Sequence, residues 1–257
     1  MLNIKYEKSF YRNLKIFLLH YKMLLLFDVD NTLTISRGKI TNEMKEMLYA
    51  LKNKYDLGVV SGSDFPKLKE QLEDAINCFT WIFSENGLAT YFEGKLFSST
   101  NIVQNLGEQL YGELINDCML EMSKIKLPVK RGVFLELRTG LLNICPIGRS
   151  CSQSEREEFE KYDNEFKIRE NLCNILSSKY KNLRFSIGGQ ISIDVFPYGW
   201  DKTYCLDFIV DKYPEIYFYG DRICEGGNDY EIGNDKRVTK SHSVKNWKDT
   251  LEYLKKL

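Results

Sequence analysis

The strongest pattern in the chain is an unbroken apolar run, Met23–Phe27, that ends in an acidic pair, Asp28 and Asp30, and a polar turn reaching Arg37. A strand whose consecutive residues are all apolar is buried on both faces, which is typical of a parallel sheet covered by helices. Open α/β folds bind their ligands at the carboxyl edge of such a sheet. The pattern therefore predicts that the acidic pair lies at a ligand-binding edge.

The next segments alternate between helix and strand patterns. Apolar residues at helical spacing follow Thr41, a residue type that caps helices, and a second helix pattern covers Lys67–Ile76. The short apolar runs Asp56–Val60 and Trp81–Phe83 each end in a polar turn. This alternation predicts a βαβ arrangement in which the polar turns meet at one edge of the sheet.

The pattern changes near residue 90. Short alternating runs around glycine turns predict antiparallel hairpins, and two long segments have the apolar spacing of helices. The hairpins are expected at Tyr91–Phe97, Val133–Cys145 and Arg184–Phe196, and the helices at Asn101–Lys124 and Ser154–Ser178. Hairpins and helices inserted into a parallel α/β chain predict a separate α+β module.

The first pattern returns at Trp200, with a helix expected over Asp201–Val210, a strand over Ile216–Tyr219 and a final helix over Trp247–Leu254. The predicted fold is α/β, with a Rossmann-like parallel-sheet core over residues 1–98 and 200–257 and an inserted α+β cap domain over residues 99–199. Residues 1–22 have apolar positions at helical spacing, and we expect an extra helix there rather than a secretory signal.

Composition narrows the possible partners. The 257 residues carry 36 basic and 36 acidic side chains, so there is no overall basic field to bind nucleic acid or an anionic membrane. No apolar run approaches the roughly 20 residues that span a bilayer. Seven cysteines without a CxxC pair predict reduced thiols in a cytoplasmic protein. Two histidines leave few parts for a histidine metal site or a Ser/His/Asp triad.

The acidic pair has two interpretations. Residues two apart on an extended chain point the same way, so Asp28 and Asp30 share a face if strand geometry continues past Phe27. Two carboxylates that close need a compensating cation, most simply a hard divalent ion such as Mg²⁺. The alternative, which the pattern alone supports equally well, is an acidic loop that caps a helix, because aspartate is common in turns after strands.

Three further polar segments favour the metal site. SGSD, GWDK and YGDR are expected at the same edge as FDVDNT. A metal held by Asp28 and Asp221 would allow the Asp28 carboxylate to attack phosphorus and form an aspartyl-phosphate. Ser63 and Lys202 would hold the phosphoryl oxygens. Asp30 would donate a proton to the leaving oxygen and later accept one.

These segments resemble the motifs of a known superfamily. FDVDNTLT, the Ser-Gly-Ser turn, GWDK, and GD followed by GGND are similar to the motifs of the haloacid dehalogenase-like phosphotransferases. Within it, RGVFLELRTGLLNICPIGRSCSQSER, SIGGQISIDVFPYGWDKTYC and GGNDYEI resemble the eukaryotic phosphomannomutases, over nearly all of the chain from Met23 onward. Asn31 stands where the superfamily has glycine, and asparagine tolerates the left-handed backbone conformation better than most residues.

The resemblance implies roles for individual residues. Asp28 would be the phosphorylated nucleophile, Asp30 the acid/base that also offers a ligand to Mg²⁺, and Asp221 the remaining carboxylate ligand. Ser63 and Lys202 match the residues that stabilise the phosphoryl group. The family's sugar-phosphate contacts fall on Arg37, Arg138, Arg149, Arg156, Ser192 and Asp194. A further cation site falls on Gly233, Asp235 and Val238.

The arginines also carry a prediction of their own. Arg138, Arg149 and Arg156 are expected on a hairpin strand, the loop beyond it and the start of a helix, close enough in sequence to converge. Guanidinium groups bind phosphate at two points, so three of them in a neutral protein indicate a dianionic partner. The alternative is solvated surface charge. Similarly, Ser192 and Asp194 share a strand face that would bind sugar hydroxyls or form a polar outer face.

The implied activity is conversion of mannose 6-phosphate to mannose 1-phosphate, which supplies GDP-mannose synthesis. The resemblance also implies Mg²⁺ as cofactor, a hexose 1,6-bisphosphate as intermediate and activator, and a homodimer formed through the cap domain. A sugar-phosphate or sugar-bisphosphate phosphatase with the same nucleophile is the alternative. A non-catalytic sugar-phosphate-binding protein is disfavoured by the complete set of Asp28, Asp30, Lys202 and Asp221.

Overall fold

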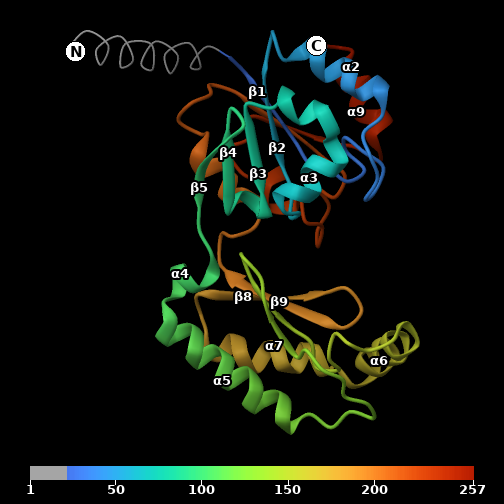
Figure 1. Ribbon diagram of the computed structural model, residues 1–257, viewed down its shortest axis with the longest axis vertical. Helices are drawn as coiled ribbons and strands as arrows, with labels where there is room; N and C mark the ends of the chain where they lie inside the picture. The colour runs from blue at the N-terminus through green and yellow to red at the C-terminus, as the bar shows by residue number, and fades with distance from the viewer. Residues whose placement is uncertain (1–21) are drawn as a thin grey trace, which may run out of the picture. The chain divides into compact units, whose positions relative to one another are not determined.

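The computed structural model describes residues 22–257, and the helix expected over residues 1–22 lies, but for Lys22, outside them (Figure 1). The chain divides into two units. The first, called the core unit below, runs up to Ser99 and resumes as Gly199–Leu257, and the second, the insert unit, is Thr100–Tyr198.

Within the described residues, the core unit contains a seven-stranded sheet in the order β11-β10-β1-β2-β3-β4-β5 (Figure 1). Neighbours from β11 to β3 are parallel, whereas β4 and β5 form an antiparallel hairpin. Its turn residues, Glu93 and Gly94, have φ of 49° and 73°, the left-handed values expected of a two-residue hairpin loop. The strands are β1 (Leu24–Phe27), β2 (Asp56–Val60), β3 (Trp81–Ser84), β4 (Ala89–Phe92), β5 (Lys95–Ser99), β10 (Ile216–Gly220) and β11 (Lys240–Ser243).

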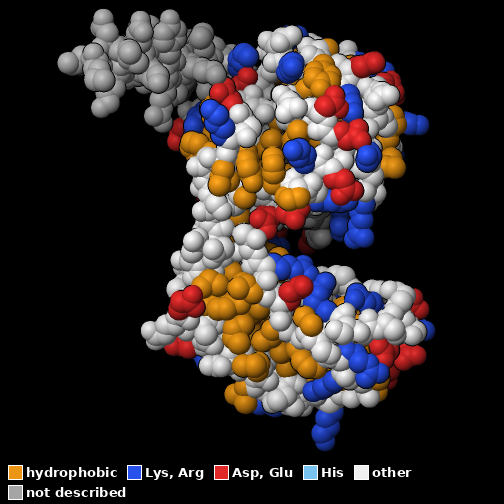
Figure 2. Space-filling model, viewed as in Figure 1, with side chains coloured by type: hydrophobic (Ala, Val, Ile, Leu, Met, Phe, Trp, Pro, Cys, Tyr) orange, Lys and Arg blue, Asp and Glu red, His pale blue; other side chains and the backbone are white. Residues whose placement is uncertain are grey.

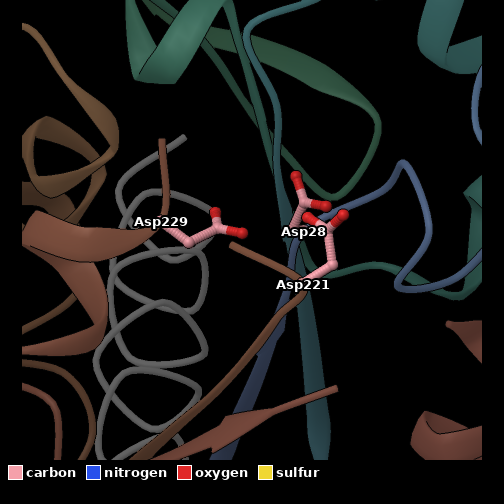
Figure 3. Close-up of side chains that lie close together, drawn as sticks. All are labelled: Asp28, Asp221 and Asp229. Atoms are coloured by element: carbon pink, nitrogen blue, oxygen red, sulfur yellow. The ribbon is translucent and has the colours of Figure 1, made fainter. Parts of the chain in front are cut away.

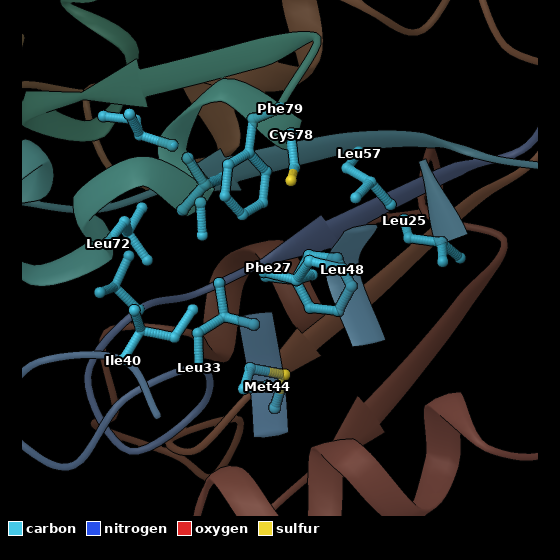
Figure 4. Packing of buried hydrophobic residues seen from close by; sticks show 14 of the residues in the cluster. Leu25, Phe27, Leu33, Ile40, Met44, Leu48, Leu57, Leu72, Cys78 and Phe79 are labelled. Atoms are coloured by element: carbon cyan, nitrogen blue, oxygen red, sulfur yellow. The ribbon is translucent and has the colours of Figure 1, made fainter. Parts of the chain in front are cut away.

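Every residue of β1 is buried, and successive side chains enter hydrophobic clusters on opposite faces of the sheet. Leu25 and Phe27 join the cluster shown in Figure 4, to which α2 and α9 contribute. Leu24 and Leu26 join the second cluster, together with residues of η3 and α8. The helices of this unit are α2 (Asn42–Leu51), α3 (Phe65–Leu72), α8 (Tyr230–Gly233) and α9 (Trp247–Leu254), with 3₁₀ helices η1 (Glu73–Cys78), η2 (Glu85–Gly87) and η3 (Lys202–Phe208).

The insert unit contains, in the described part of the chain, a four-stranded antiparallel sheet in the order β6-β7-β9-β8. Apolar and polar residues alternate along its strands, so that Leu142, Ile144, Ile193 and Val195 share one face and are fully buried. In Figure 1, α5 and α7 run beside this sheet. The elements are β6 (Leu135–Leu137), β7 (Leu142–Ile144), β8 (Leu183–Gly188), β9 (Ser192–Pro197), α4 (Ile102–Leu106), α5 (Glu108–Lys124), α6 (Gln153–Phe166) and α7 (Ile168–Lys179).

The predicted α/β fold class with a separate antiparallel module is confirmed, but several helices differ from their predictions. Gly107 (φ 78°) and Lys167 (φ 54°) interrupt the two helices predicted as continuous in the insert unit, because left-handed residues end a helix. The helix predicted over Lys67–Ile76 begins earlier, where Asp64 caps it, and ends as the 3₁₀ helix η1. The segment Asp201–Val210 forms the 3₁₀ helix η3 rather than an α-helix.

The seven cysteines all lie in the described residues and are free thiols. Six are buried, and Cys224, in the loop after β10, is exposed. Among the described helices, none combines the length and apolar character needed to cross a membrane.

Candidate active site

Three segments of the core unit that follow neighbouring parallel strands lie at the carboxyl edge of the sheet. Asp28 directly follows β1, and its backbone N–H donates to the carbonyl oxygen of Tyr219 in β10 (2.9 Å). Asp221 directly follows β10, and Ser63 lies in the turn after β2. Because β1 pairs with both β10 and β2, the structure brings these segments to one edge of the sheet.

Asp28, Asp221 and Asp229 form an acidic cluster, the one group of this kind found among the described residues (Figure 3). One carboxylate oxygen of each lies within 4.8 Å of the others. Burial raises the pKa of Asp28 to about 6, against the opposing effect of Lys202, and burial also raises the pKa of Asp221. Carboxylates this close and this poorly hydrated need a cation in order to stay ionised.

Lys202 provides one such cation. It is the first residue of η3, its side chain is 2% exposed, and its ammonium group donates to the carboxylates of Asp28 and Asp229, at 2.6 Å from the latter. Burial lowers the pKa of this lysine, but the two carboxylates outweigh burial and the net shift is upward. Lys202 is therefore a charged group held against the predicted nucleophile.

The remaining charge suits a divalent ion. With the three carboxylates and the ammonium group all ionised, the cluster keeps two negative charges, which one divalent cation balances. Carboxylate oxygens are the hard ligands that Mg²⁺ prefers. The residues present thus fit a magnesium ion held by Asp28, Asp221 and Asp229.

Asp30 lies outside this cluster. Its Oδ1 accepts hydrogen bonds from the backbone N–H of Arg37 and from the side-chain amide of Gln71 (3.0 Å). These two donors fix the orientation of the carboxylate two residues from Asp28, where a proton-transfer group is expected. A role for Asp30 as metal ligand stays a prediction.

Asn31 adopts the left-handed backbone conformation expected at the position where the superfamily has glycine (φ 59°). Its side-chain amide donates to Asp221 (3.0 Å), and its amide oxygen accepts from the backbone N–H of Ser36 (3.1 Å). The side chain that glycine lacks therefore orients one carboxylate of the acidic cluster and closes the turn.

Two glycines permit the close approach of the loop that carries Asp229. A Cβ atom on Gly220 would lie 2.7 Å from the Asp229 Oδ2 atom, and one on Gly227 would lie 2.0 Å from the carbonyl oxygen of Arg222. In return, the backbone N–H of Arg222 donates to Asp229 (3.1 Å). The position of Asp229 thus depends on the absence of side chains at two neighbouring positions.

The other predicted core residues occupy varied environments. Ser63 is half-buried, and its turn is fixed by a hydrogen bond from its own backbone N–H to the hydroxyl of Ser61 (3.1 Å). Arg37 is exposed and has a left-handed backbone (φ 56°). Both lie in turns of the core unit that follow β1 or β2, as the sequence predicts.

The residues of the predicted further cation site are engaged in bonds within the protein. The Asp235 carboxylate pairs with the guanidinium group of Arg237 through Nε (2.9 Å) and Nη2 (2.7 Å). The carbonyl oxygen of Gly233 accepts from the hydroxyl of Ser241 (2.6 Å). These groups have partners without a metal ion, and the second cation site stays a prediction.

The insert unit gathers the remaining predicted residues on the polar face of its sheet. Arg149 donates through Nη1 to the side-chain oxygen of Asn143 (2.8 Å) and lies 3.5 Å from the hydroxyl of Ser192. Arg156, in the first turn of α6, donates to the carbonyl oxygen of Arg149 (3.2 Å). Asn143 in turn donates to Asp194 (2.6 Å).

Glu136 links two arginines on the same face. Its carboxylate accepts from Nε of Arg138 (2.8 Å) and lies 3.2 Å from Nε of Arg149. Glu136, Asn143 and Asp194 stand opposite one another on β6, β7 and β9. The structure therefore brings Arg138, Arg149 and Arg156, called the arginine group below, together with Ser192 and Asp194.

Three side chains of the candidate sites were not predicted from the sequence. Asp229 ends the GGND segment, which was identified as a motif without a role for its aspartate. Glu136 and Asn143 occur inside the segment that carries the arginines, and their pairing across strands was the available signal, since both alternate with leucine and isoleucine.

Comparison with known proteins identifies relatives of this chain. The sequence model described as eukaryotic phosphomannomutase matches residues 44–257. The chain is 53% identical to phosphomannomutase 1 of Dictyostelium discoideum, over 90% of this chain and 95% of that protein. It is 49% identical to a phosphomannomutase of Dendrobium officinale, over 91% of this chain and 93% of that protein.

Solved structures share the fold at low sequence identity. A trehalose-6-phosphate phosphatase of Aspergillus fumigatus matches with a TM-score of 0.61 and 12% identity, over 95% of both chains. A haloacid dehalogenase-like hydrolase of Bacteroides thetaiotaomicron matches with a TM-score of 0.54 and 15% identity, over 91% of this chain and 99% of that one. At these identities the likeness concerns the fold alone.

Proposed function

The chain belongs to the eukaryotic phosphomannomutase family and is an enzyme of that activity, and we propose that it works through phosphorylation of Asp28. The observation that carries this proposal is the contact of the buried Lys202 ammonium group with Asp28 and Asp229. A carboxylate that attacks a phosphoryl group needs nearby positive charge to limit repulsion between the two anions. Lys202 supplies that charge and holds the Asp28 side chain in one orientation.

Mg²⁺ is the proposed cofactor, held by Asp28, Asp221 and Asp229. When bound, it would offset the negative charge of the phosphoryl oxygens and of the carboxylates around them. The fixed orientation of Asp221 by Asn31 supports this assignment, because a ligand already oriented loses less entropy on binding. Asp30 as an additional ligand and the further cation site at Gly233 and Asp235 are secondary proposals taken from the family resemblance.

Asp30 is the proposed acid/base. Its Oδ1 is occupied by Arg37 and Gln71, which holds the carboxylate in place while leaving its second oxygen to exchange a proton with a sugar hydroxyl. Ser63 is proposed to bind a phosphoryl oxygen through its hydroxyl group, which its fixed turn supports.

The arginine group is the proposed second phosphate site, because a mutase must also hold the phosphate that does not react. Guanidinium groups suit a phosphate dianion, and Ser192 and Asp194 would contact sugar hydroxyls. The exposed Arg37 is proposed as a further phosphate contact. A hexose 1,6-bisphosphate would then serve as intermediate and activator, each of its phosphates visiting Asp28 in turn.

The experiment uses purified protein with Mg²⁺ and either mannose 1-phosphate or glucose 1-phosphate, with and without hexose 1,6-bisphosphate. Phosphorus NMR follows isomer formation and inorganic phosphate release together. We expect the bisphosphate to accelerate isomer formation, which then exceeds phosphate release. Phosphate release without isomer formation would instead identify a phosphatase, and comparison of the two substrates measures the preference for mannose.

A homodimer through the insert unit is also proposed. Exposed apolar side chains occur on α5 and on or beside the edge strand β6, namely Met119, Leu120, Val133, Phe134 and Leu137, with Leu120 and Leu137 55% and 54% exposed. Met119 and Phe134 line one hollow. Figure 2 shows hydrophobic side chains gathered on the face of this unit that carries α5. Exposed patches of this kind mark protein–protein interfaces.

Light scattering after gel filtration tests the dimer. We expect Leu120→Glu to yield monomers, because a charge in the patch opposes its burial. Leu96→Glu, at a core-unit leucine that is 59% exposed, is the matched control and should leave the mass unchanged. We propose a cytoplasmic location as well, which the free thiols support, and a role in supplying GDP-mannose synthesis.

A further inference from the structure

The carboxylate of Glu136 contacts two side chains of the arginine group. Its Oε2 atom lies 2.8 Å from Nε and 2.6 Å from Nη2 of Arg138, and 3.2 Å from Nε of Arg149. One carboxylate oxygen is therefore shared by two guanidinium groups, which is the arrangement in which arginines bind a phosphate oxygen.

These contacts can exchange for contacts with a ligand. The side chains of Glu136, Arg138 and Arg149 are 37%, 41% and 30% exposed, so an anion from solution reaches them. Partly exposed ion pairs are also weak, because solvent competes for both partners. By contrast, Arg149 is held in place independently through Asn143, which is 1% exposed.

We infer that Glu136 is a positioning residue that competes with the bound phosphate for Arg138 and Arg149. The inference rests on the proposed function, in which the arginine group holds the unreacted phosphate. Before a ligand binds, Glu136 keeps the two guanidinium groups turned toward the site. Once a phosphate is bound, the same carboxylate repels it. When the phosphate leaves, Glu136 forms its ion pairs with the two arginines again.

A mutase has a particular need for such a competitor. The bisphosphate intermediate must release the phosphate held by the arginines before its other end can bind there. Binding that is stronger for the intermediate than for the transition state slows turnover, since only differential binding accelerates a reaction. Glu136 therefore limits affinity in favour of release.

The test is Glu136→Gln, which keeps the shape of the side chain and removes its charge. Binding of inorganic phosphate is measured by titration calorimetry in EDTA without Mg²⁺, where the acidic cluster repels phosphate and the arginine group is the site measured. We expect the dissociation constant to fall by about 10-fold, on the scale of a charge-assisted contact. In the mutase assay, KM and kcat should both fall, because substrate binds more tightly and the intermediate is released more slowly.

A purely structural role predicts the opposite pattern. If Glu136→Gln binds phosphate more weakly than the wild type or equally well, or raises KM, the competitor role is overturned. Glu136→Asp keeps the charge, and its dissociation constant should stay within about 3-fold of the wild type; a 10-fold fall there would show that charge is not the cause.

Two further variants separate this inference from the proposed function. Glu121→Gln removes one carboxylate that pairs with Lys124 on α5, away from the arginine group, and phosphate affinity should not change. Arg149→Met should abolish phosphate binding. If it does not, the arginine group is not the phosphate site and the proposed function fails there; if it does while Glu136→Gln has no effect, only the competitor role fails.

Discussion

Each unit buries a cation within its described residues, and the two cations are paired in different ways. In the core unit, Lys202 lies against Asp28 and Asp229, with Asp221 in the same cluster. One positive charge thus faces three carboxylates. Two charges remain uncompensated by the protein, and the pKa of Asp28 is raised by its burial.

In the insert unit, Arg169 is 4% exposed and faces a single carboxylate. Its Nε donates to Asp163 (2.7 Å), and its Nη1 donates to the carbonyl oxygens of Gly189 (2.9 Å) and Ser192 (3.3 Å). The pair is neutral, and the Nη1 group is bound by backbone carbonyl oxygens of the β8–β9 hairpin. Arg169 therefore stabilises the strand that carries Ser192 and Asp194.

The comparison teaches that charge balance separates a reactive buried cation from a structural one. Both side chains are buried and hydrogen-bonded, so burial alone does not distinguish them. Only the cluster around Lys202 keeps net negative charge, which the proposed metal ion would balance. Changing one aspartate should therefore lower activity in the core unit and stability in the insert unit.

Asp28→Asn tests the core unit and has the largest expected effect. It removes the proposed nucleophile while keeping the size of the side chain, and kcat/KM should fall on the order of 10⁴-fold for both isomer formation and phosphate release. Steady-state assays at saturating Mg²⁺ measure the loss. Full activity in this variant would contradict both enzymatic interpretations of the site.

Asp163→Asn is the matched change in the insert unit. It leaves the Arg169 charge buried without a carboxylate, which should lower the free energy of unfolding by about 3–5 kcal/mol. Urea denaturation followed by circular dichroism measures this loss. Because Asp163 contacts no proposed catalytic residue, kcat of the folded enzyme should stay the same; a large fall in kcat without a loss of stability would refute the structural assignment.

The pH dependence of stability sharpens the comparison. The folded-state pKa of Asp28, about 6, lies above the ordinary value of 3.8, so folding favours the protonated carboxyl. The stability that this contributes is complete below about pH 4 and is lost as the pH rises through about 6, by about 3 kcal/mol. Between pH 4 and pH 8 in EDTA, Asp28→Asn should therefore gain about that much stability relative to wild type. Thermal and urea unfolding of both proteins check the difference, and parallel pH profiles would contradict it.

Gly220→Ala has the smallest expected effect. Its Cβ would lie 2.7 Å from Asp229 Oδ2, so the carboxylate must move, and a displacement of this size should lower kcat/KM by about 10²-fold. Gly112→Ala is the control. Gly112 lies in the helix α5, and a Cβ atom at this position would meet nothing within 4 Å. This variant should leave kcat/KM unchanged and, if anything, raise thermal stability; equal losses in both variants would contradict the steric argument.

Much of the fold follows from local pattern. An unbroken apolar run predicts the buried strand β1, because a strand buried on both faces needs apolar residues at every position. The Glu93-Gly94 pair predicts a hairpin turn, because glycine readily adopts the left-handed conformation. The break at Lys167 does not, since nothing local marks a lysine for the left-handed conformation. The polar edge strand β11 was also missed, because its residues are held by pairing with β10 rather than by burial of apolar side chains.

Some residues of the candidate site could also be predicted from local pattern, and others could not. Asp28, Asp221 and Lys202 stand beside strands or turns that the sequence predicts, so their convergence follows from the topology. Asp229 reaches the cluster by way of a loop whose course depends on contacts at Gly220 and Gly227. The GGND motif marks this loop in the sequence, but it does not show that its aspartate joins Asp28 and Asp221. The role inferred for Glu136 likewise depends on its contacts with Arg138 and Arg149, which the sequence alone does not show.

The single exposed thiol among the seven cysteines has a practical consequence. Cys224 lies three residues after Asp221, in the loop that leads to Asp229, while the other six thiols are buried. A maleimide fluorophore added to the native wild-type protein should therefore attach at one position without any cysteine being removed. Such a label would report by its emission on magnesium and sugar phosphate arriving beside the acidic cluster.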